Sequence, residues 1–184
     1  RLSEAEMKKR QERALKEVDD TWDKAELYAK LENSDELRNY PEIEALVPVV
    51  KGTLPLFIEV NAAKDILSAI EWVKGRGYAK VILTGVAEGW RVADEIAASG
   101  YPVITGPVQA IPTRQSDNYD AAYANPGVMS KAGVKVALRT MESENVRNLP
   151  YHAGFAAAYG MGKEEALKAI TINAAEILGI GDQL

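Results

Sequence analysis

The sequence contains no cysteine and only one histidine, His152. Without cysteine the chain has no disulfide bond, no thiolate nucleophile and no cysteine-ligated zinc, and its redox compartment stays open. No apolar run approaches the roughly 18 residues that a membrane-spanning helix needs, so we expect no membrane partner. A dinucleotide-binding fingerprint, a P-loop and a GxSxG nucleophile elbow are also missing, which removes three common sources of function in α/β proteins.

An excess of positive charge is missing as well. The chain has 22 Lys and Arg against 27 Asp and Glu, for a net charge of −5. Because nucleic-acid binding depends on clustered Lys and Arg, we expect no nucleic-acid partner. The charged amino terminus lacks the apolar core of a signal peptide, so the cytoplasm is the default location. A removed signal peptide remains compatible with a chain that does not begin with Met.

The composition favours a globular chain with one core. Hydrophobic residues make up 47% of the 184 positions, enough for one domain or part of one. We divide the chain into an amino-terminal helical segment, 1–50, and an α/β segment, 51–184.

The first segment has the periodicity of a long amphipathic helix. Apolar residues recur at helical spacing from Ser3 to about Leu31, and Ser3 and Glu6 have the spacing of a capping box. Its charged face is typical of a solvated surface. Asn33 and Ser34 are expected to interrupt the helix, before a shorter helical run over 42–50.

The pattern of apolar residues changes after residue 50. Short apolar runs alternate with amphipathic helical patterns, as in parallel sheets covered by helices. We predict helices over 62–74 and 88–98, and a long loop over 106–125. The four predicted strands are 56–60, 80–83, 102–105 and 134–138.

A polar turn follows the last predicted strand. It contains Arg139, Glu142, Arg147 and Asn148, and a helix is predicted from about Pro150. Since ligands of α/β proteins usually bind at the carboxyl ends of the strands, this turn is the first place to expect a site. The loop over 106–125, which contains Arg114, is either a substrate-binding or lid element or a surface loop without function.

Five stretches of the sequence carry a family resemblance. They are VNAAKDILSAI (60–70), VILTGVAEGWRVADEIAASGYPVITGP (81–107), GVKVALRT (133–140), NVRNLPYHAGFAAAYGMGK (145–163) and, most specific of all, EEALKAITINAAEILGI near the end. They resemble the carboxyl-terminal half of proteins of the amidohydrolase superfamily, most closely its imidazolonepropionase- and prolidase-like branch. The resemblance covers about residues 42–184.

The resemblance implies a TIM-type (β/α)8 barrel of which this chain supplies strands five to eight. Half a barrel leaves two open strand edges and an exposed apolar face. We therefore expect an amino-terminal half, a second chain or a further copy of this chain to close it.

The resemblance also implies a divalent metal that activates water. The strand-five histidine of the family falls at Glu59, the strand-six region at Thr84 and Gly85, and the strand-eight aspartate at or near Met141. None of these positions keeps the family residue, so we assign no metal ligand in this chain and leave the cofactor unknown.

Two functions remain open. The first is a segment of a hydrolase acting on C–N bonds of cyclic amides or dipeptide-like substrates. The second is a metal-free relative that binds a small ligand or acts as a structural partner. The predicted catalytic residues are Glu59, Arg139, Glu142 and His152, and the predicted substrate-binding residues are Asn61, Arg114, Arg147 and Asn148.

Three of these assignments have competing interpretations. Arg139 suits a carboxylate substrate, or it forms an ion pair with Glu59 in place of a lost metal. Glu142 is a candidate for acid–base chemistry, or part of a solvated turn. His152 is a candidate base or ligand, although a lone histidine near a helix start is more often a partly exposed polar residue.

Overall fold

The computed structural model describes residues 3–31 and 40–183. The chain divides into two compact units, Arg1–Pro55 and Leu56–Leu184, which we call unit 1 and unit 2 and describe separately. The interruption predicted at Asn33 and Ser34 lies outside the described residues.

Unit 1 is helical. Helix α1 spans Glu4–Lys30, and the predicted capping box is present because Glu6 N–H donates to the Ser3 hydroxyl while Ser3 N–H donates to the Glu6 carboxylate. The run predicted over 42–50 forms two short helices, α2 (Pro41–Glu44) and α3 (Val47–Val50), which pack against α1. Among the described residues of this unit, Ala25 and Val47 are the buried apolar side chains.

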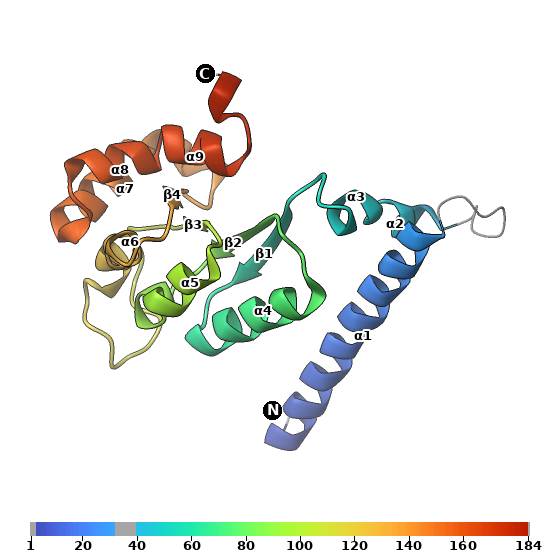
Figure 1. The fold of residues 1–184 in the computed structure, drawn as a ribbon. Coiled ribbons are helices and arrows are strands. Elements are labelled where there is room, and N and C mark those ends of the chain that lie inside the picture. The colour runs from blue at the N-terminus through green and yellow to red at the C-terminus, as the bar shows by residue number, and fades with distance from the viewer. Residues whose placement is uncertain (1–2, 32–39, 184) are drawn as a thin grey trace. The chain divides into compact units, whose positions relative to one another are not determined.

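Unit 2 contains a four-stranded parallel sheet in the order β1-β2-β3-β4, visible in Figure 1. The α/β class with parallel strands is therefore confirmed. The strands lie within two residues of their predicted bounds, and the order follows the sequence because each crossover brings the next strand alongside the previous one. They are β1 (Leu56–Val60), β2 (Val81–Gly85), β3 (Val103–Thr105) and β4 (Val136–Leu138).

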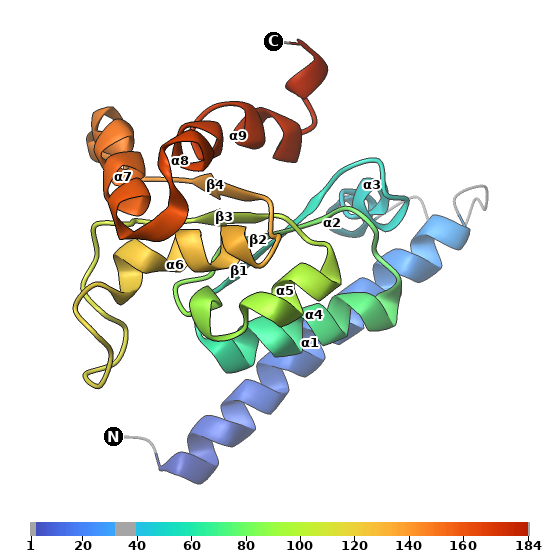
Figure 2. The same ribbon diagram turned by 60° about the vertical axis from the view of Figure 1, so that its left-hand side comes forward.

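Three helices follow the first three strands and line one face of the sheet in Figure 2. They are α4 (Ala63–Arg76), α5 (Ala93–Ser99) and α6 (Ala121–Lys131), with the 3-10 turn η2 (Gly89–Arg91) before α5. Each helix has a fully buried apolar side chain, namely Ile66, Ile96 and Met129.

Helix α6 corrects the loop predicted over 106–125, which ends at Asp120. Pro126 lies inside this helix, and a proline there removes one backbone hydrogen bond and normally indicates a helix end. The neighbouring Gly127 allows the helix to pack closely against the segment around Met161. A Cβ at Gly127 would lie 2.7 Å from the backbone nitrogen of Met161, so only glycine permits this close packing.

The carboxyl-terminal part of unit 2 begins with the 3-10 turn η3 (Ser143–Asn148) and helix α7 (Leu149–Ala156). A π-helical segment, η4 (Ala157–Met161), leads to α8 (Lys163–Ala169), α9 (Ile172–Ile177) and η5 (Gly181–Gln183). Ile177 and Ala174 of α9 pack against Ile82, Ile104 and Ala137 of three neighbouring strands. No described helix is long and apolar enough to span a bilayer.

Candidate functional site

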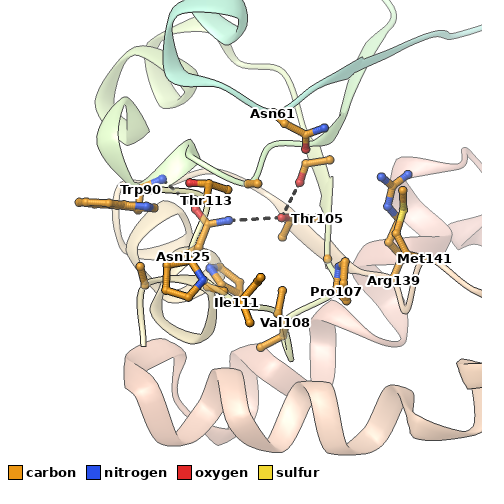
Figure 3. A pocket seen from close by; sticks show the side chains of 18 residues that line it. Asn61, Trp90, Thr105, Pro107, Val108, Ile111, Thr113, Asn125, Arg139 and Met141 are labelled. Atoms are coloured by element: carbon orange, nitrogen blue, oxygen red, sulfur yellow. Dashed lines mark hydrogen bonds between the residues drawn. The ribbon is translucent and has the colours of Figure 1, made fainter. Parts of the chain in front are cut away.

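A pocket of about 250 Å³ lies at the carboxyl ends of the four strands (Figure 3). Each strand contributes through the residue at its end or just beyond it: Asn61 after β1, Gly85 of β2, Gly106 after β3 and Arg139 after β4. The carboxyl ends of parallel strands meet at one edge of a sheet, which is why residues so distant in sequence share this pocket. The other lining residues are Ala87, Trp90, Thr105, Pro107, Val108, Ala110, Ile111, Pro112, Thr113, Ala121, Ala122, Asn125, Pro126 and Met141.

The strand register places Glu59 and Arg139 on one face of the sheet. Glu59 pairs with Thr84, Thr84 with Ile104 and Ile104 with Ala137, and Arg139 follows two residues later. Side chains two residues apart in an extended chain point to the same side. This shared face brings the arginine to the glutamate across the two intervening strands.

Glu59 and Arg139 form the ion pair that the sequence predicted as one of two alternatives. Arg139 Nη2 donates to Glu59 Oε1 at 2.7 Å, and Thr84 Oγ1 donates to Glu59 Oε2 at 2.6 Å. The hydrogen bond from Arg139, assisted by that from Thr84 and opposed by partial burial, holds the pKa of Glu59 below its ordinary value. Glu59 is therefore an ionised carboxylate with both oxygens engaged.

The residues present do not fit a divalent metal at the positions that the resemblance implies. A guanidinium lies against the Glu59 carboxylate, and Met141 offers a thioether that suits hard cations poorly. Met141 also has a φ of 73°, a left-handed backbone conformation that is uncommon for residues other than glycine. Among the residues that the structure describes, no three His, Cys, Asp or Glu side chains form a group able to hold a metal.

His152, the single histidine, lies buried on α7 and is not among the residues that line the pocket. Its Nδ1 accepts a hydrogen bond of 3.0 Å from the backbone N–H of Val108, which does line the pocket. Burial lowers the pKa of His152 from its ordinary value, so the neutral imidazole is favoured. Through this hydrogen bond His152 links Val108 of the pocket lining to α7.

Glu88, which was not among the predicted site residues, binds the loop that carries Thr113 and Arg114. It is 3% exposed, and its Oε2 accepts hydrogen bonds from Ala63 N–H at 2.9 Å and from Arg114 Nη2 at 2.6 Å. Its Oε1 accepts one from the Thr113 hydroxyl at 3.2 Å. The hydrogen bond from Arg114 contributes most to lowering the pKa of Glu88 to about 2. Arg114 thus binds Glu88 and is not among the residues that line the pocket.

A second ion pair supports the same loop, since Arg91 of η2 bonds Asp117. The Asp117 side chain is only 3% exposed although it comes from a surface loop. With Arg114 and Glu88, this pair gives the loop over 106–120 two charged attachments to the segment after β2. Buried carboxylates require such partners, because an unpaired charge is costly away from water.

Asn125 lines the pocket and connects three segments of the chain; Figure 3 shows its hydrogen bond to Thr105. Its Oδ1 accepts from Trp90 N–H at 2.8 Å, and its Nδ2 donates to the Val86 carbonyl at 2.9 Å and the Thr105 hydroxyl at 3.3 Å. Thr105 in turn donates to the Gly85 carbonyl at 2.7 Å. The polar groups of Asn125 and Thr105 are thus used to shape the pocket.

The remaining predicted residues lie apart from the pocket lining. Glu142 is exposed and its carboxylate accepts from the Asn145 side chain at 2.7 Å. Arg147 is exposed, and Asn148 donates to the Asn145 side chain at 3.2 Å. Of the eight predicted site residues, Asn61 and Arg139 line the pocket, and Glu59 contacts it through Arg139.

The fold and pocket define an α/β protein with parallel strands and a small-molecule-sized cavity at their carboxyl ends. A crystal structure of an amidohydrolase from Thermotoga maritima MSB8 is similar to 90% of this chain, with a TM-score of 0.77 and 24% sequence identity. At this identity the likeness establishes the fold. The chain covers 44% of that protein.

Sequence comparison adds a second amidohydrolase. The chain is 32% identical over 117 residues to Amidohydrolase tasK of Hapsidospora irregularis, an alignment that covers 56% of this chain and 12% of that protein. The chain thus spans less than half the length of either relative. No protein-family model matches it. The sequence similarity to this amidohydrolase supports the resemblance to the amidohydrolase superfamily.

Proposed function

We propose that unit 2 is a segment of an amidohydrolase-like protein whose pocket binds a small organic molecule without a metal held by this chain. The observation that carries the proposal is the Glu59–Arg139 ion pair at the strand ends beside the pocket. It introduces a fixed cation at the place where the resemblance implies a metal. A mostly apolar pocket with a few polar groups is typical of a small-molecule site.

The experiment combines metal analysis with ligand binding on the purified chain. We expect no stoichiometric divalent metal, no thermal stabilisation by Zn²⁺ or Mn²⁺, and binding of small organic compounds measured by calorimetry. Ala122→Trp, which fills the pocket, is expected to abolish binding. Ala98→Trp places the same ring at an exposed position of α5 outside the pocket lining and serves as the control. Stoichiometric metal, or equal binding by both variants, would contradict the proposal.

The second candidate function is hydrolysis of a C–N bond in cyclic amide or dipeptide-like substrates by a larger protein. The sequence similarity to an amidohydrolase favours it. Metal ligands would then come from outside the residues described here. Assays of such substrates, with and without a chelator, test this candidate on a protein that also supplies the remainder of the barrel.

We also propose that the four strands form strands five to eight of a TIM-type barrel. The matched 44% of the Thermotoga maritima structure supports this. An amino-terminal half, a second chain or another copy would complete the barrel. Native mass spectrometry separates these cases, because one chain has a mass of 20.0 kDa and any partner adds to it.

A further inference from the structure

The nitrogen atoms of the Arg139 guanidinium differ in their hydrogen bonding. Nη2 donates to Glu59 Oε1 at 2.7 Å, whereas Nε is buried and has no hydrogen-bond partner within the described part of the chain. The arginine side chain as a whole is 25% exposed. A guanidinium carries five N–H donors in a fixed planar arrangement, so Arg139 can exchange the Glu59 carboxylate for that of a ligand.

The pocket gives this cation an unusual position. Among the described lining residues, Arg139 is the one charged side chain. The apolar wall comes from Trp90, Val108, Ile111 and three prolines. A pocket with one cation and an apolar wall matches a molecule with one anionic group and an apolar body.

Three other polar side chains of the pocket already have hydrogen-bond partners, and Asn61 adds a neutral amide. The Thr105 hydroxyl donates to the Gly85 carbonyl, and Asn125 uses its amide for Val86 and Thr105. The Thr113 hydroxyl lies within hydrogen-bond distance of the carboxylates of Glu88 and Asp117. The charged donor in the pocket is therefore Arg139.

Glu59 accepts a hydrogen bond from Arg139 and has a second donor, Thr84. Its side chain is 47% exposed, and Thr84 donates to its second oxygen at 2.6 Å. A carboxylate that is half in solvent can give up one partner at modest cost, because water replaces the lost hydrogen bond. The bond from Thr84 stays available when Arg139 turns to another anion.

We infer that the pocket takes a small monocarboxylate with an apolar or aromatic body, and that Glu59 competes with this ligand for Arg139. The inference rests on the proposed function and names the ligand class of that pocket. Glu59 would weaken binding in the resting protein. A ligand of this class displaces the Glu59 carboxylate from Nη2 and leaves it on the Thr84 hydroxyl.

The test compares carboxylates with amides of the same shape. Benzoate and phenylacetate are titrated by calorimetry into the full chain at neutral pH, beside benzamide and phenylacetamide. We expect the carboxylates to bind more tightly than their amides. Glu59→Gln should tighten carboxylate binding about tenfold and leave amide binding within about twofold, because removing a charged competitor frees an ionic hydrogen bond.

Arg139 variants test the other half of the inference. Arg139→Gln should weaken carboxylate binding about tenfold or more and amide binding by a smaller factor, while Arg139→Lys should keep part of the carboxylate preference. Glu176→Gln and Lys135→Gln break an ion pair outside the pocket lining and serve as matched controls for loss of one charge. Circular dichroism establishes that each variant is folded.

The outcomes separate this inference from the proposed function. Equal binding of carboxylates and amides by the unmodified chain overturns the ligand class while the small-molecule pocket stands. Carboxylate binding that Glu59→Gln leaves unchanged overturns the competition. If neither carboxylates nor amides bind at millimolar concentration, the proposed function itself fails.

Discussion

Arg114 reaches from the loop after β3 to Glu88 after β2, and its Nη2 donates to Glu88 Oε2 at 2.6 Å. The two residues differ in exposure, since the arginine side chain is 51% exposed and the glutamate side chain 4%. The pair therefore joins a solvated cation to a carboxylate that depends on partners for its charge. Residues 110–113 of the same loop line the pocket, so this ion pair holds one pocket wall in place.

Arg114→Ala is expected to loosen that wall. The loss leaves Glu88 with Ala63, Thr113 and the more distant Arg91 as partners, and we expect the free energy of unfolding to fall. Limited proteolysis should cut the loop over 106–120 faster than in the unmodified chain. Lys168→Ala removes a cation from a more exposed ion-paired cluster on α8 and is the control. An unchanged cleavage rate would show that Arg114 does not restrain the loop.

Acid is expected to weaken the same attachment. The pKa of Glu88 is about 2 in the folded chain and ordinary in the unfolded chain, so the unfolded state binds the proton first. The contribution of ionised Glu88 to the free energy of unfolding is fully present above pH of about 4.5 and is lost as the pH falls toward about 2. Urea unfolding measured across this range should show a smaller pH dependence in Glu88→Gln. An identical pH profile in the two proteins would contradict this assignment.

His152 should give a separate pH dependence at higher pH. Burial lowers its pKa in the folded chain, so the stabilisation is present above the unfolded value of about 6.5 and is lost as pH falls through the lower folded value. Protonation of Nδ1 would also remove the acceptor for Val108 N–H. His152→Phe leaves this buried N–H unpaired and should lower the free energy of unfolding by about 1–3 kcal/mol.

The measurement for His152 is urea unfolding from pH 7.5 to pH 5, and the slope below pH of about 6.5 should be smaller in His152→Phe. His152→Asn, whose side-chain oxygen can accept a hydrogen bond, is the comparison and should lose less stability at neutral pH. Equal losses in both variants would mean that packing rather than the hydrogen bond to Val108 determines the effect.

Two glycine substitutions test the packing of α6. Gly127→Ala places a Cβ 2.7 Å from the backbone nitrogen of Met161, so we expect a loss of about 1–3 kcal/mol, as for overpacked cores. Gly75→Ala, in α4, meets no atom within 4 Å and should stabilise the chain by about 0.5–1 kcal/mol. Thermal unfolding distinguishes the two signs, and stabilisation by Gly127→Ala would contradict the close approach.

The sequence allowed prediction of those parts that depend on local patterns. The capping box of Ser3 and Glu6 and the four strands follow from residue spacing and short apolar runs. The contact of Arg139 with Glu59 could be anticipated because both residues were assigned to carboxyl ends of strands in one parallel sheet.

The other features depend on packing between distant segments. Helix α6 was missed because Pro126 and Gly127 indicate a break locally, whereas the space beside Met161 requires glycine. Glu88 was overlooked because its partners lie 25 and 26 residues away, at Ala63 and Arg114. The spacing of a charged residue along a helix carries no information about such contacts.

Glu88 joins two segments that are far apart in sequence. Its carboxylate accepts the first amide proton of α4, at Ala63, and also holds the loop through Arg114. Opening of the loop therefore removes partners from the same carboxylate that satisfies the start of the helix. Hydrogen exchange of the Ala63 amide and of the amides around Thr113 should report one shared opening event, so that this part of unit 2 behaves as a single cooperative unit.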